Sequence, residues 1–200
     1  YEVSIPKPIR PAIILSVEND ELKIPAGLQD RVIQTYEGVV YMDFAEKLIE
    51  RQGHGYYEEL DSKLLPPLYI AYTTKLSEDT EVFHNDIRGR FNRGDREVVE
   101  AMEFWAELAQ QTRDLLKEKR GQDIGPLLNA NFDRRRQVYN MSEGNIRMVE
   151  TARATGATAK FTGSGGAIVG TYPDEETYEQ LVECLTPLGM NVIKPIITQS

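Results

Sequence analysis

The stretch FTGSGGAIVG, residues 161–170, places the small residues GSGG between two apolar segments. These flanking segments, ATAKFT at residues 157–162 and AIVGTY at residues 167–172, are rich in β-branched and aromatic side chains and predict two strands. Glycine adopts backbone angles that other residues avoid, and successive exposed N–H groups can hold an anion. Two interpretations are therefore open: a wide hairpin turn, or a loop against which another backbone or a ligand packs.

The segments around this turn predict one sheet with helices on one side. Residues 174–189 predict a helix that Asp174 caps, with acidic residues in its first turn. The segment LYIAYTT, residues 68–74, predicts an earlier strand, and residues 190–197 predict a last one. We therefore expect an α+β fold with one layer of each kind.

Helical patterns precede the glycine turn. Residues 79–121 are interpreted as helical, with Asp95 capping the long helix and Trp105 packing in the core. Two more helices are expected at residues 123–139 and 144–156.

At the start of the chain, the pattern predicts the secondary structure less clearly. The apolar run RPAIILSVEND, residues 10–20, fits a short helix and a strand equally. Pro25 and Gly27 then break the chain. A short helical piece, a turn at Gly38 and a strand at residues 39–44 are expected to follow.

Composition and charge exclude some classes of partner. The net charge is −9, from 23 basic and 32 acidic residues, so no nucleic-acid partner is expected, because phosphate polymers bind positive faces. No apolar run approaches the roughly 20 residues of a membrane span, so no membrane partner is expected. Cys184, the single cysteine, favours a reducing, cytoplasmic compartment and is expected to be a mostly buried, inert thiol. His54 and His84 are expected to be structural or surface residues.

Two carboxylates near the Pro-Ala-Gly break are candidates for chemistry. Asp30 follows the break at the start of a short helix, where it either caps the helix or acts as a base for a hydroxyl proton. Glu18, earlier in the chain, is either a solvated helix carboxylate or a ligand for Mg²⁺. Magnesium takes one or two carboxylates together with phosphate oxygens and water.

A third candidate is a pair on the helix expected at residues 123–139. Asn131 and Arg135 follow Leu127 at intervals of four residues, so both point along its apolar stripe. A buried guanidinium must be paired. The partner of Arg135 is either an internal carboxylate or an anionic group of a substrate.

Three segments resemble one family. AGLQDRVIQTYEGVVYMDF at residues 26–44, NFDRRR at residues 131–136 and AKFTGSGGAIV at residues 159–169 resemble segments of the GHMP small-molecule kinases. The nearest likeness is the glucuronokinase branch, and LLPPL at residues 64–68 favours it too. The likeness covers most of the chain.

The resemblance implies a fold and a division into domains. It implies that residues 63–200 form a C-terminal GHMP-kinase domain, a ferredoxin-like sheet with helices. It implies that residues 1–62 are the end of an N-terminal domain similar to ribosomal protein S5 and that this part carries Asp30.

The resemblance also implies roles for particular residues. Asp30 matches the family's active-site aspartate, the base or orienting group for the attacking hydroxyl, and Glu18 falls where such kinases carry a magnesium-binding glutamate. The third motif, which packs against the phosphate-binding loop and borders the substrate, is matched by Gly163, Ser164, Gly165 and Gly166. Arg135, with Asn131, is the candidate for the carboxylate of a sugar, an assignment that depends mainly on the helix face.

The sequence departs from the family pattern in three places. Glu37 stands where many relatives have a glycine before Gly38. The stretch between Glu18 and Asp30 is one residue longer than in close relatives, which puts the position of Glu18 in question. The chain also lacks the family's N-terminal half with its phosphate loop, so we expect it to be the later part of a longer protein.

Three functions are therefore weighed. The leading expectation is a part of an ATP- and Mg²⁺-dependent kinase that phosphorylates the anomeric hydroxyl of a uronic acid, glucuronate to glucuronate 1-phosphate. Without its N-terminal half, this chain is expected to be weak or inactive. The alternatives are a non-catalytic sugar-binding or regulatory module on the same scaffold, and a GHMP kinase for another sugar.

Overall fold

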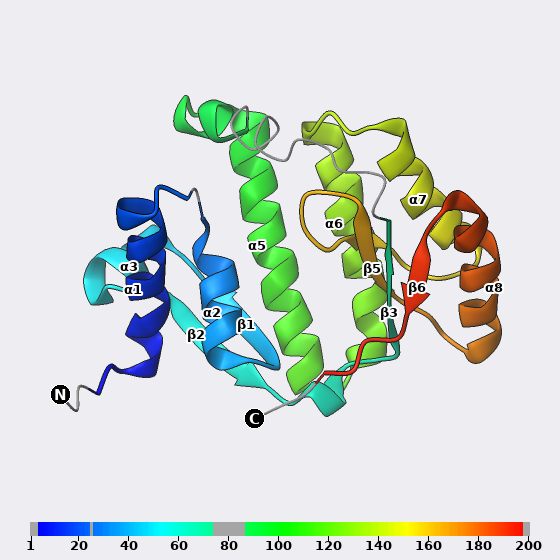
Figure 1. Ribbon diagram of the computed structural model, residues 1–200, viewed down its shortest axis with the longest axis horizontal. Coiled ribbons are helices and arrows are strands. Elements are labelled where there is room, and N and C mark those ends of the chain that lie inside the picture. The colour runs from blue at the N-terminus through cyan, green and yellow to red at the C-terminus, as the bar shows by residue number, and fades with distance from the viewer. Residues whose placement is uncertain (1–3, 25, 74–86, 198–200) are drawn as a thin grey trace. The chain divides into compact units, whose positions relative to one another are not determined.

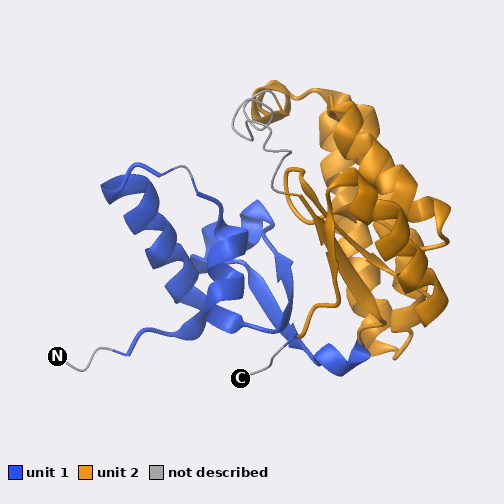
Figure 2. Cartoon of the chain, turned by 45° about the vertical axis from the view of Figure 1, so that its right-hand side comes forward, with its two compact units in different colours: residues 1–64, 197–200 blue, residues 65–196 orange. Residues whose placement is uncertain are grey.

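The computed structural model describes residues 4–24, 26–73 and 87–197 of the 200-residue chain. The chain divides into two compact units, Tyr1–Leu64 with Ile197–Ser200 and Leu65–Ile196 (Figure 2).

The first unit begins with helices. The chain runs through a 3-10 turn, η1 (Lys7–Ile9), then α1 (Arg10–Ser16) and the π-helical turn η2 (Val17–Glu21). Of the two interpretations open for the first apolar run, the helix is correct, and Pro11 sits in its first turn, where no N–H is needed. α1 packs against α2 (Leu28–Tyr36), which lies beside it in Figure 1.

An antiparallel pair of strands completes this unit. β1 (Val39–Asp43) pairs with β2 (Tyr56–Leu60), and α3 (Glu46–Gln52) lies between them in the chain. The strand β1 was predicted; α3 and β2 were not, because α3 is short and charged and the consecutive glutamates Glu58 and Glu59 interrupt the apolar pattern of β2. The turn η3 (Ser62–Leu64) follows β2.

The end of α2 has an unusual backbone. Glu37 has φ 60° and ψ 177°, and the next residue, Gly38, has φ 63°. This conformation is essentially restricted to glycine, because a Cβ clashes with the neighbouring carbonyl groups. Glu37, the position at which the family resemblance expects a glycine, is therefore strained.

The second unit contains a four-stranded antiparallel sheet. Its strands are β3 (Leu68–Tyr72), β4 (Lys160–Phe161), β5 (Ala167–Thr171) and β6 (Asn191–Ile193), in the spatial order β4-β5-β3-β6. The four strands predicted in this part of the chain are confirmed, although β4 and β6 are shorter than expected. Thr74, the last residue of the strand predicted at residues 68–74, lies outside the described residues.

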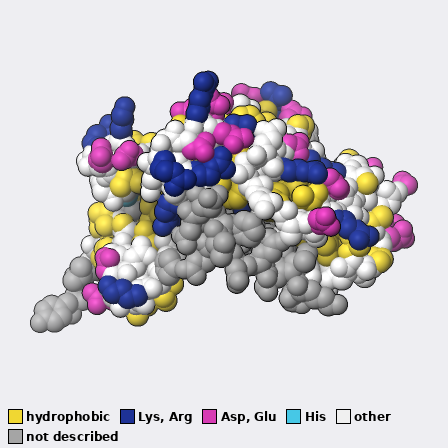
Figure 3. Space-filling view, turned by 90° about the horizontal axis from the view of Figure 1, so that it is seen from above, with side chains coloured by type: hydrophobic (Ala, Val, Ile, Leu, Met, Phe, Trp, Pro, Cys, Tyr) yellow, Lys and Arg dark blue, Asp and Glu magenta, His cyan; other side chains and the backbone are white. Residues whose placement is uncertain are grey.

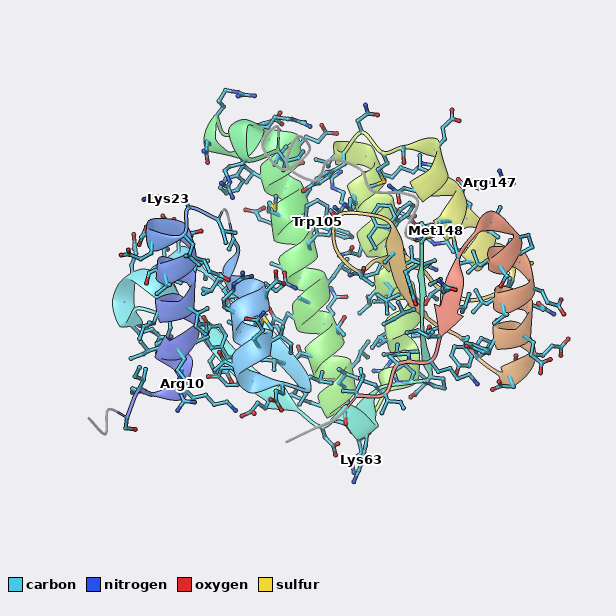
Figure 4. All side chains as sticks on the ribbon, viewed as in Figure 1. Arg10, Lys23, Lys63, Trp105, Arg147 and Met148 are labelled. Atoms are coloured by element: carbon cyan, nitrogen blue, oxygen red, sulfur yellow. The ribbon has the colours of Figure 1, made fainter. Side chains whose placement is uncertain are left out.

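Helices cover one face of this sheet. α7 (Glu143–Ala154) and α8 (Glu175–Leu185) lie beside it in Figure 1, and α6 (Gly125–Val138) packs along β4 and β5. On α7, Met148 points into the unit while its neighbour Arg147 points outward (Figure 4). The main core contains Tyr69, Ala71, Phe132, Met148, Val149, Ala152, Phe161, Ile168, Leu181 and Leu185. The predicted α+β arrangement is confirmed.

The long helix α5 (Arg96–Lys117) packs on α6 and forms a second, smaller core. Asp95 caps it, as predicted, because its carboxylate accepts a hydrogen bond from the backbone N–H of Glu97. Trp105, labelled in Figure 4, packs beside this core, so the interpretation of Trp105 as a packing residue is confirmed. The turn η4 (Gly121–Ile124) joins α5 to α6.

The prediction that the single cysteine is mostly buried is wrong: Cys184 is exposed. The buried positions of α8 are Thr177, Leu181 and Leu185, at intervals of four residues, and Cys184 lies one step round the helix from them. Asp174 caps α8 as predicted, and the turn η5 (Thr186–Leu188) follows it.

The two histidines were expected to have structural or surface positions. His54 is half-buried in the first unit, with Nδ1 2.6 Å from the carbonyl oxygen of Gly55, which fits a structural role. His84 lies outside the described residues.

Basic and acidic side chains alternate over the face seen in Figure 3. Among the helices in the described part of the chain, none has the length and apolar character that crossing a membrane requires.

Candidate active site

Asp30 lies in the first turn of α2, and its side chain is 72% exposed. Gly27 occupies the N-cap position and no side chain bonds the cap, so the interpretation of Asp30 as the helix cap is wrong. The partial positive charge of a helix N-terminus nevertheless favours a carboxylate in the first turn. Its exposure leaves the carboxylate accessible to a hydroxyl, as a general base must be.

Arg31 connects the two carboxylates that the sequence singled out. Its Nη1 lies 3.3 Å from Oδ2 of Asp30, and its Nη2 donates to Oε1 of Glu18 at 2.5 Å. Its Nε donates to the other carboxylate oxygen of Glu18. This hydrogen bonding to Glu18 raises the pKa of Arg31. We call Glu18, Asp30 and Arg31 the carboxylate cluster.

A magnesium ion fits the carboxylate cluster only in competition with Arg31. Glu18 and Asp30 supply the one or two carboxylates that magnesium takes, but Arg31 bonds both oxygens of Glu18. No group of three or more metal-ligating side chains occurs within residues 4–24, 26–73 and 87–197. The role of Glu18 as a magnesium ligand therefore stays a prediction.

The glycine loop, residues 162–166, joins β4 to β5 and is held by Asn145 of α7. Asn145 is 1% exposed, and its Oδ1 accepts the backbone N–H of Gly166 at 2.9 Å. A Cβ on Gly165 would lie 2.8 Å from Nδ2 of Asn145. Gly165 and Gly166 also have φ of 155° and 72°, which favour glycine. Within this unit, packing and backbone conformation therefore favour glycine at position 165, and backbone conformation favours it at position 166.

Gly163 has a different environment. A Cβ added to Gly163 would meet nothing within 4 Å, so the described part of the chain gives no steric reason for a glycine there. The neighbouring Ser164 is exposed. Open space beside a glycine allows a ligand or another backbone to come close.

Arg135 of α6 reaches this loop. Its Nη1 donates to the carbonyl oxygen of Gly163 at 2.7 Å, and its Nη2 lies 3.5 Å from the carbonyl oxygen of Ser164. Its guanidinium stacks over the rings of Tyr139 and Phe161, 4.8 and 5.3 Å from their centroids. Burial lowers the pKa of Arg135 because it disfavours the charged form.

Arg135 has no described carboxylate partner, unlike two other arginines of this unit. Arg136 pairs with Glu150 and Arg153 pairs with Asp133, whereas no described carboxylate pairs with Arg135. The interpretation that Arg135 has an internal carboxylate partner is therefore not supported by the described residues, and its role toward a substrate stays a prediction.

Asn131 lies one turn before Arg135 on α6 and is half-buried. Its backbone carbonyl accepts a hydrogen bond from the indole N–H of Trp105 at 3.2 Å. Its side-chain amide has no hydrogen-bond partner among the residues that the structure describes, so the amide is available to a ligand.

Lys160 brings a second cation to the glycine loop. Its Nζ donates to the carbonyl oxygen of Phe161 at 2.9 Å, next to the loop. Burial lowers the pKa of Lys160, and the nearby charge of Arg135 lowers it further. No carboxylate in the described part of the chain pairs with Lys160. We call Arg135 and Lys160 the cationic pair.

Three residues of these clusters were missed in the sequence. Lys160 carried a usable signal, because it is a lysine between the apolar Ala159 and Phe161 in a predicted strand. Arg31 directly follows Asp30, and this adjacency was a weaker signal. Asn145 had none, because its contact with the loop joins segments that are distant in the chain.

Comparison with known protein families agrees with the fold. Residues 112–187 match the family model described as GHMP kinases C terminal. The chain is 42% identical over 178 residues to Glucuronokinase 1 of Arabidopsis thaliana, and the match covers 88% of this chain and 49% of that protein. The chain therefore spans about half the length of this relative.

Solved structures share the fold at low sequence identity. The Lin0012 protein from Listeria innocua superposes with a TM-score of 0.78 at 14% identity, covering 100% of this chain and 61% of that chain. Galactokinase from Lactococcus lactis, complexed with galactose, superposes with a TM-score of 0.68 at 15% identity, covering 99% and 61%. These neighbours confirm the expected fold.

Proposed function

Because the chain carries a GHMP kinase C-terminal domain and is related to the glucuronokinases, we propose that it is the C-terminal part of an ATP-dependent sugar kinase. The reaction transfers the γ-phosphoryl group of ATP to the anomeric hydroxyl of a uronic acid, from glucuronate to glucuronate 1-phosphate. The observation that carries this proposal is the 42% identity to Glucuronokinase 1 over 88% of the chain.

Asp30 is the proposed catalytic residue. Phosphoryl transfer depends on positioning and on charge neutralisation more than on covalent chemistry. As the sugar hydroxyl attacks phosphorus, Asp30 accepts or orients its proton, for which its carboxylate is sufficiently exposed. ATP supplies the phosphoryl group, and Mg²⁺ offsets the charge of its phosphates.

The other proposed roles follow the same pattern. Glu18 is the proposed magnesium ligand, and Arg31 holds its carboxylate in place when no ion is bound. Arg135 and Asn131 are proposed to bind the sugar carboxylate through the guanidinium and the free amide. The proposed cofactor-binding residues at the glycine loop are Gly163, Ser164, Gly165 and Gly166.

An N-terminal half is the proposed partner of the first unit. That half would supply the phosphate-binding loop, in keeping with the 49% of Glucuronokinase 1 that this chain covers. Several large apolar side chains in the first unit are 38–60% exposed, as expected for a surface that another part of the protein covers. They are Ile9, Ile13, Ile14, Val17, Leu22 and Ile24. We assign the kinase to the cytoplasm, where the exposed thiol of Cys184 stays reduced.

The test measures kinase activity of the full-length protein with glucuronate and Mg-ATP, with and without Asp30→Asn. We expect kcat to fall by about 10²–10⁴-fold, the usual contribution of a general base, with the unfolding midpoint unchanged. Glu50→Gln, an exposed carboxylate of α3, is the matched control and should keep full activity. Full activity of Asp30→Asn contradicts the assignment.

One observation favours the non-catalytic module as a second candidate. Arg31 bonds both oxygens of Glu18, the residue that would bind magnesium. Calorimetry on the full-length protein separates the two functions: a module binds the sugar but never ATP. A panel of uronic acids and neutral hexoses in the kinase assay then tests whether another sugar is the substrate.

A further inference from the structure

The cationic pair holds two positive charges that the described part of the chain does not neutralise. Lys160 and Arg135 donate hydrogen bonds to backbone carbonyl oxygens of Phe161, Gly163 and Ser164. A carbonyl oxygen satisfies a donor, but it carries no net charge. The two side chains are therefore positioned at the glycine loop without a described carboxylate partner.

Two cations elsewhere in this protein have carboxylate partners. In the first unit, Arg31 bonds both oxygens of Glu18. In the second unit, Lys194 contacts both carboxylate oxygens of Glu175, at 2.6 and 2.7 Å. The chain has 32 acidic residues, so acidic partners are not scarce.

Keeping two such cations together is unfavourable without an anion. Burial and the charge of Arg135 both lower the pKa of Lys160, so the surroundings disfavour its charged form. A bound anion reverses both effects, because it supplies the missing opposite charge. Each side chain also has N–H groups beyond those bonded to the loop, and these can reach a ligand.

We propose that Lys160 and Arg135 together form an oxyanion subsite at the glycine loop, in which Lys160 is an additional specificity-determining residue. The planar guanidinium fits a carboxylate or phosphate group through paired N–H donors, and the ammonium adds a point charge. The anion is a carboxylate, that of the sugar; a phosphate group has the same chemistry and is distinguished by the test. The identity of the anion as a sugar carboxylate rests on the proposed function, whereas the subsite itself does not.

This arrangement explains selection of a charged sugar over a neutral one. A neutral hexose leaves both cations without an anion, so it forgoes the interaction that the subsite offers. Sites with buried polar groups reject ligands that cannot pair with them. Lys160 thus discriminates by charge.

The test measures binding calorimetrically in the full-length protein without ATP, using glucuronate, glucose and inorganic phosphate as separate ligands. In Lys160→Met we expect glucuronate to bind at least about ten-fold more weakly, the effect of losing one close charge pair, with glucose unchanged. Lys160→Arg, which keeps the charge, should recover most of the affinity. Lys194→Met is the matched control and should bind as the wild type does.

Each outcome of the calorimetry either supports the subsite or contradicts it. If phosphate binding falls in Lys160→Met while glucuronate binding is unchanged, the subsite stands and its anion is a phosphate group. If neither anion loses more than about two-fold in affinity, the subsite is wrong. An NMR titration of the Lys160 ammonium gives an independent reading: glucuronate should raise the pKa of Lys160, and an unchanged pKa contradicts contact with the anion. Neither readout requires turnover, so a protein without kinase activity refutes the proposed function and leaves this result interpretable.

Discussion

The carboxylate cluster and the cationic pair differ in whether their charges have partners of opposite sign among the described residues. In the first unit, Arg31 lies between Glu18 and Asp30 and bonds to both. In the second unit, Arg135 and Lys160 lie together; the described residues that meet them supply backbone carbonyl oxygens and aromatic rings but no carboxylate. In the first group opposite charges meet within the chain, whereas in the second no described residue supplies the opposite charge.

This difference indicates which of the two groups of charged side chains binds a ligand. An ion pair within the chain needs no ligand to account for it, because each charge offsets the other and the pair stabilises the fold or orients its members. Arg135 and Lys160 lack a described carboxylate partner and lie beside a loop with open space at Gly163, so an external anion can supply the opposite charge. The proposed catalytic role of Asp30 is consistent with its exposure, because its side chain is 72% exposed while that of Glu18 is 21% exposed.

The largest expected effect tests how the loop holds the cationic pair. In Gly165→Ala, the new Cβ lies 2.8 Å from the amide of the buried Asn145, at a φ that disfavours any side chain. We expect the free energy of unfolding to fall by about 1–3 kcal/mol, measured by chemical denaturation. The anion affinity should fall too, because the loop carbonyls that position the cations move.

Gly163→Ala is the matched control in the same loop. Its Cβ meets nothing within 4 Å, so stability should change by less than about 0.5 kcal/mol. If Gly163→Ala destabilises the protein as much as Gly165→Ala does, the distinction between the two glycines is wrong.

A smaller effect concerns the helix that carries Asp30 and Arg31. Glu37→Gly removes the backbone strain at this position, because its conformation suits only glycine. The added glycine also raises the conformational entropy of the unfolded chain, which offsets part of the gain. We expect the first unit to gain about 1 kcal/mol, measured as a higher midpoint of chemical denaturation. Glu50→Gly, inside α3, should have the opposite sign and lose about 1 kcal/mol. A loss in both variants would show that Glu37 is unstrained.

The smallest effect is a pH dependence from the cationic pair. The folded-state pKa of Lys160 lies below its ordinary value of 10.5. Between these two values the unfolded chain binds more protons than the folded chain, so the unfolding free energy rises with pH. Without ligand, Lys160→Met should therefore be more stable than the wild type by less than about 1 kcal/mol at neutral pH, a margin that shrinks toward pH 10.5. Chemical denaturation of both proteins at increasing pH measures this difference in unfolding free energy. A difference that grows with pH contradicts the prediction.

Local patterns in the sequence predicted much of the fold. Asp95 and Asp174 were identified as helix caps because a cap depends on residues only a few positions away. The strands on both sides of the glycine loop were identified from their β-branched side chains. The first apolar run stayed ambiguous, because a short run has the same composition as helix or strand.

The sequence selected Asp30, Glu18 and Arg135 as site residues, but not what surrounds them. It gave no indication that Arg31 bonds Glu18, or that Asn145 holds Gly166. It also placed Cys184 on the wrong side of α8. Each of these errors concerns a neighbour that is distant in the chain, or a helix face that distant elements decide.

The sequence by itself determined most of the elements, the caps at Asp95 and Asp174 and the family resemblance, because these depend on local spacing and on residue identity. The tertiary structure decided which charges are compensated. A charge is neutralised only by an opposite charge within a few ångströms, and the groups around Arg135 and Lys160 come from α6, from β4 and from the loop between β4 and β5, which folding alone brings together.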